Sequence, residues 1–130
     1  MRQDIHTIED IKILVDTFYS KVQIDELIGG IFMGTIRDWP THLEKMYRFW
    51  STILLDAQTY RGQPFLPHSS MPVEQKHFDR WLGYWHETVD EFFSGNVAEE
   101  AKFRGALMSR IFLSKIKQIQ NKEWETLGLK

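Results

Sequence analysis

Apolar residues recur every three or four positions along most of the chain, and this spacing predicts helices. The first stripe predicts a helix over residues 8–24, and Thr7 followed by Asp10 matches the capping box that begins many helices. We expect its buried face to consist of Ile8, Ile11, Leu14, Val15, Phe18 and Val22.

Glycines interrupt the pattern over residues 29–34, so we expect residues 31–33 to form a short turn that directs Phe32 inward. A second helix is predicted after Asp38, which is a good N-cap residue, and runs to about residue 57. Its apolar face is broad and comprises Leu43, Met46, Tyr47, Phe49, Trp50, Ile53 and Leu54.

Proline and glycine then change the character of the chain over residues 58–72, where three of the four prolines fall within nine residues. Such a segment is irregular but stiff, and a loop of this length in a small protein is usually functional. Helices are predicted from about residue 73 to Ser94 and over residues 97–120, and no segment alternates as a strand does. The sequence therefore predicts an all-α protein of four main helices in one domain over residues 1–130.

The composition argues against several classes of function. Hydrophobic residues make up 42% and charged residues 26%, which is typical of a globular protein, and 16 basic against 18 acidic residues give a net charge of −2. That balance argues against nucleic acid as a partner. The absence of cysteine excludes disulfides, thiolate catalysis and iron–sulfur clusters. With no signal peptide and no run of about 20 apolar residues, we expect a cytoplasmic protein without a membrane span.

Histidines and aromatic residues supply the candidate chemistry. His68 follows the stiff loop, which would suit a metal ligand held at one angle, although a loop histidine is more often simply exposed. His42 lies on an apolar helical face, where a core histidine is the common case, whereas His77 and His86 are expected to be solvated. Tyr19 and Trp81 would each be ordinary core residues if taken alone. The 14% of aromatic residues could fill a core or line a pocket for a flat ligand.

Other enzyme signatures are missing. The sequence holds no P-loop, dinucleotide-binding glycine motif, HExxH motif or hydrolase serine motif, and its acidic residues are scattered over helix surfaces.

A set of spaced motifs links these residues. It comprises Phe18-Tyr19, then Phe32, then Trp39-x-x-His42-Leu-x-Lys45-Met46-x-x-Phe49-Trp50, then Tyr60-x-Gly62-x-Pro64-x-x-x-His68, then His77-Phe78-x-x-Trp81-Leu82, and finally Glu87-Thr88-Val89-Asp90 with Phe93 and Gly95 after it. In order and spacing this set resembles group III of the truncated haemoglobins, and the resemblance extends from the first helix to about residue 115. It implies a truncated globin fold, a helical sandwich that encloses haem b.

The resemblance also implies roles for individual residues. His68 matches the proximal ligand of the haem iron, and Tyr19 and Trp81 match distal residues that donate hydrogen bonds to a bound ligand. His42 matches a distal position that gates the pocket. Among the remaining matches, Phe32 packs on the haem face, Lys45 pairs with a haem propionate, and Met46 and Phe49 are pocket walls.

The function implied is reversible binding of O₂, NO and CO. Strong donors suit O₂, NO or peroxide chemistry with an external reductase, of a dioxygenase or peroxidase type, better than bulk O₂ transport. Two alternatives stay open. One is a haem-based sensor or electron-transfer module in which His42 also ligates the iron, and the other is a helical interaction module without a cofactor.

Overall fold

The computed structural model describes residues 2–55 and 73–126, and the side chains of residues 120–126 are outside that description. These residues form five helices, which are α1 (Ile8–Gln23), α2 (Gly29–Thr35), α3 (Trp39–Leu55), α5 (Gln75–Phe92) and α6 (Asn96–Thr126). Over the same residues there is no strand, only an isolated bridge between Gln3 and Phe93. The all-α prediction is confirmed.

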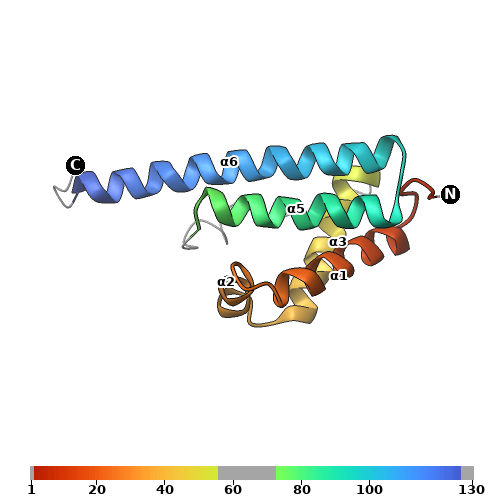
Figure 1. Cartoon of the computed structure of the whole chain (residues 1–130), viewed down its shortest axis with the longest axis horizontal. Helices are drawn as coiled ribbons and strands as arrows, with labels where there is room; N and C mark the ends of the chain where they lie inside the picture. The colour runs from red at the N-terminus through yellow and green to blue at the C-terminus, as the bar shows by residue number, and fades with distance from the viewer. Residues whose placement is uncertain (1, 56–72, 127–130) are drawn as a thin grey trace.

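The helices pack as two crossed pairs. The long helix α6 lies along α5, while α1 packs on both α3 and α5 and so joins the two pairs (Figure 1). No helix in the described part of the chain is long and apolar enough to cross a membrane.

Capping side chains set where the helices begin. Thr7 Oγ1 accepts the backbone N–H of Asp10 at 3.2 Å, and the Asp10 carboxylate accepts that of Thr7 at 3.2 Å, which is the predicted capping box of α1. Asp38 accepts the N–H of Thr41 at 3.2 Å in the first turn of α3, as its cap assignment predicts. The predicted end of this helix near residue 57 lies outside the described residues.

The predicted turn at residues 31–33 is wrong, because this segment is the helix α2. The Asp25 carboxylate accepts the N–H groups of Leu27 and Ile28 at 2.8 and 2.9 Å and so holds the chain just before the helix. A Cβ at Gly29 would lie 2.7 Å from the carbonyl oxygen of Gln23, so the glycine permits a close approach. Phe32 is nevertheless buried, as predicted.

The last helix begins at Asn96 and is longer than the predicted 97–120. Gly95 adopts φ 141°, a conformation that favours glycine, and Asp4 accepts the N–H groups of Val97 and Ala98 at 2.9 and 2.8 Å. The N-terminal segment therefore caps the first turn of α6.

Stacked tryptophans fill the centre of the fold. Trp85 is fully buried, its ring stacks on Trp50 with centroids 4.3 Å apart, and its Nε1–H donates to the carbonyl oxygen of Ala101 at 2.9 Å. A Cβ at Gly105 would lie 2.6 Å from the Trp85 ring, so α5 and α6 approach closely there. Some of the aromatic residues thus belong to the core, and others line the cavity described next.

Candidate functional site

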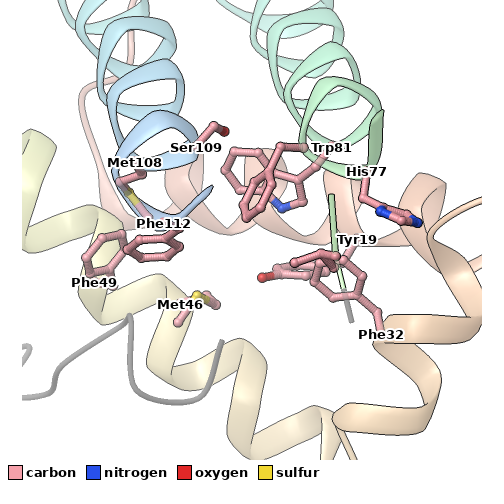
Figure 2. Close-up of a pocket in the computed structure, with 11 residues that line it drawn as sticks. Tyr19, Phe32, Met46, Phe49, His77, Trp81, Met108, Ser109 and Phe112 are labelled. Carbon is pink, nitrogen blue, oxygen red and sulfur yellow. The ribbon is translucent and has the colours of Figure 1, made fainter. Parts of the chain in front are cut away.

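A cavity of about 50 Å³ lies between the crossed helix pairs. Aromatic and apolar side chains from every helix, with a few polar groups, form its wall (Figure 2). The lining residues are Tyr19, Phe32, Met46, Phe49, Val73, His77, Phe78, Trp81, Met108, Ser109 and Phe112. None of these residues is an aspartate, glutamate, lysine or arginine, so the wall suits a flat, apolar ligand with few polar contacts.

Tyr19 brings a hydroxyl into this wall. Its side chain lies on the buried face of α1 and is 7% exposed, and burial raises the pKa of the phenol above its usual range. The hydroxyl therefore stays protonated. It lies 3.0 Å from His42 Nε2, and Figure 2 shows it directed into the cavity on the side of Met46.

His42 lies behind Tyr19 and does not itself line the cavity. The rings of Tyr19, His42 and Trp39 form a triangle of edge-to-face contacts, with centroids 5.2 to 5.7 Å apart. Trp39 Nε1 is buried and has no hydrogen-bond partner in the described part of the chain. The rings of His42 and Trp39 thus pack against the Tyr19 ring and hold it in place.

Trp81 is one of the wall residues contributed by α5. Its ring is nearly parallel to Trp85, with an interplanar angle of 11° at 6.2 Å, and meets Phe18 edge-on at 5.3 Å. Figure 2 shows the indole nitrogen turned toward the side of the cavity where Tyr19 lies. Two donors, a phenol O–H and an indole N–H, thus belong to one wall.

Comparison with known proteins is consistent with this geometry. Residues 4–112 match the family described as bacterial-like globin. The chain belongs to that family. It is 34% identical over 107 residues to the group 3 truncated hemoglobin ctb of Campylobacter jejuni, covering 78% of this chain and 80% of that protein. The crystal structure of the group III truncated hemoglobin from Campylobacter jejuni matches with a TM-score of 0.81 and 28% identity, covering 89% of this chain and 95% of that one.

The predicted truncated globin fold is therefore confirmed, and this bacterial-like globin is a haem-binding truncated haemoglobin. The chemistry of the wall fits a haem, because flat apolar side chains surround the cavity and the few polar groups are neutral donors. The flexible side chains of Met46 and Met108 belong to this wall and can adapt to the shape of a bound ligand.

The structure brings most of the predicted site residues together. Phe32, Met46 and Phe49 line the cavity beside Tyr19 and Trp81. Lys45 precedes Met46 on α3 but is exposed and outside the wall. His68, the predicted proximal ligand, lies outside the described residues.

The prediction that His77 and His86 are solvated is wrong. Both are half-buried, His77 lines the cavity, and His86 Nε2 lies 3.2 Å from the carbonyl oxygen of Lys102. Spacing could have identified His77, since it precedes Trp81 by four positions and Trp85 by eight on the same helix. Sequence reasoning also left Met108, Ser109 and Phe112 of α6 out of the site, although two of them belong to its apolar stripe.

Proposed function

We propose that this globin reversibly binds O₂, NO and CO at a haem b ligated by His68, and that it uses this site for O₂, NO or peroxide chemistry rather than bulk O₂ transport. An external reductase would supply the electrons. The observation that carries the proposal is a buried, protonated Tyr19 hydroxyl in the same apolar wall as the Trp81 indole.

Haem supplies the iron at which a diatomic ligand binds. The chain's own residues then determine how long that ligand stays. Tyr19 and Trp81 donate hydrogen bonds to it, and the low dielectric of the surrounding apolar wall strengthens both bonds. Strong retention suits a reaction on the ligand, because transport needs fast release.

The remaining predicted residues hold the cofactor. Phe32 packs on the haem face, Met46 and Phe49 line its distal side, and Lys45 pairs with a propionate. His42 controls access through its bond to Tyr19. His42 contacts the Tyr19 hydroxyl at 3.0 Å but does not line the cavity, which favours this role over iron ligation, because an iron ligand would have to enter the cavity.

The absorption spectra of the ferric, ferrous and O₂-exposed protein test the proposal. We expect a haem band in all three forms and a five-coordinate ferrous spectrum. A purified protein that takes up no haem would overturn the proposal. A six-coordinate low-spin ferrous spectrum that His42→Ala abolishes would instead establish the sensor or electron-transfer alternative.

A further inference from the structure

His77 places a hydrogen-bond donor at one end of the cavity. It lies in the first turn of α5 and is half-buried, and in Figure 2 it is on the side of Tyr19 and Phe32, away from Phe49 and Phe112. A half-buried wall residue borders both the cavity and the solvent, so His77 lies at an edge of the site.

The tautomer of His77 follows from its cap contact. The backbone N–H of Glu74 donates to His77 Nδ1 at 2.8 Å. A ring nitrogen that accepts a hydrogen bond carries no proton, so the neutral imidazole has its proton on Nε2. That Nε2–H has no partner in the part of the chain that the structure describes.

The charges around His77 nearly cancel. The backbone N–H of His77 donates to the backbone carbonyl oxygen of Glu74 at 3.0 Å. The Glu74 carboxylate lies 3.9 Å from Lys76 Nζ, and both of these side chains are largely exposed. The N-terminus of α5 adds a partial positive charge. The net charge around His77 is therefore small, and a negatively charged group can lie next to its Nε2–H donor.

We infer that His77 donates its Nε2–H to a carboxylate of the bound haem. The inference rests on the proposed function, because haem b is the carboxylate-bearing ligand. Burying two propionates among the described wall residues, none of which is charged, would be costly, so we place them at the edge of the wall, where His77 supplies a donor. Lys45, the partner implied by the family resemblance, is exposed and outside the wall.

Haem and its dimethyl ester separate this role from simple packing, because the ester lacks the carboxylates. The measurement is the rate at which each leaves the protein for an excess of a haem-free acceptor globin. We expect His77→Phe to lose haem about tenfold faster, as for one lost hydrogen bond to a charged group. It should lose the ester at the wild-type rate, and His77→Gln, whose amide also donates, should retain haem better than His77→Phe.

Lys45→Met removes the propionate partner that the family resemblance implies and is measured in the same assay, and circular dichroism of each haem-free variant checks that the helices remain. Equal acceleration for haem and ester would show that His77 acts by packing or by capping α5, and would overturn the inference. So would an unchanged haem rate, or a carboxylate-dependent effect in Lys45→Met alone. A wild-type protein that takes up neither compound overturns the proposed function itself, which is a distinct result.

Discussion

The Tyr19 hydroxyl and His42 Nε2 lie 3.0 Å apart, and this bond links the cavity wall on α1 to α3. The hydroxyl has one proton, so it either donates to His42 or accepts from it. Only when it accepts from His42 is its proton available to a ligand in the cavity. His42 therefore determines how well Tyr19 can hold a ligand.

Removing either wall donor should speed release of O₂. A hydrogen bond to a charged or strongly polar group contributes about 1.5–3 kcal/mol, which corresponds to roughly a tenfold to hundredfold change in rate. We expect Tyr19→Phe and Trp81→Phe each to raise the O₂ dissociation rate, measured by stopped-flow displacement with CO. The double variant should be non-additive, because both donors share one acceptor. Unchanged release in both single variants would contradict the donor role.

Ligand entry should depend on His42. A protonated imidazole prefers water, so we expect His42 to leave Tyr19 and open a path when falling pH protonates it. CO recombination after photolysis should then quicken at lower pH in the wild type. His42→Ala should recombine fast at every pH. A wild-type CO recombination rate that does not change with pH and equals that of His42→Ala would show that His42 does not control ligand entry.

The proximal ligand is tested by His68→Ala, which should lose most of its haem or bind added imidazole in place of the side chain. Titration with haem, followed by absorption, measures the loss. His86→Ala is the matched control, because that imidazole already contacts the carbonyl oxygen of Lys102. A His68→Ala protein that keeps a five-coordinate histidine spectrum would show that another residue ligates the iron.

The sequence predicted the helix ends correctly where residues within a few positions of each other determine them. The capping box at Thr7 and the Asp38 cap of α3 depend on residues within four positions, and both are confirmed. Glycine misled the prediction at α2, because Gly29 serves a contact with the carbonyl oxygens of Gln23 and Val22 at the end of α1, six and seven positions earlier, which the local rules do not record. The cap that Asp4 provides for α6 was not predicted for the same reason, because 93 positions separate Asp4 from Val97.

The candidate site was also predicted only where local spacing or the family resemblance reveals a residue. His77 was assigned to solvent because it was judged to lie off the apolar face of its helix, although its spacing from Trp81 places it on the cavity side of α5. The bond between Tyr19 and His42 joins two helices, and no spacing within either helix reveals it. The family resemblance named both residues, and only the three-dimensional arrangement shows that they contact each other.

A buried carboxylate provides a test of the fold that is independent of haem. The Asp25 side chain is 3% exposed and accepts hydrogen bonds from the backbone of Leu27 and Ile28, from Tyr84 and, at 3.1 Å, from Arg80. Burial alone would raise its pKa. The hydrogen bonds and the Arg80 charge outweigh burial, so the pKa of Asp25 is lowered. This carboxylate joins the end of α1 to α5 and precedes α2.

Asp25→Asn should therefore destabilise the protein at neutral pH. Losing the charge-assisted bonds should lower the free energy of unfolding by about 1.5–3 kcal/mol, measured by urea denaturation at pH 7. Because the folded pKa lies below the unfolded value of about 3.9, the stabilising contribution is present above that pH and is lost as pH falls through the folded pKa. The difference between wild type and variant should shrink on acidification. Glu87→Gln, which removes an exposed ion pair with Lys21, is the control and should cost under about 1 kcal/mol. A difference for Asp25→Asn that does not change with pH would mean that its carboxylate gains nothing from these partners.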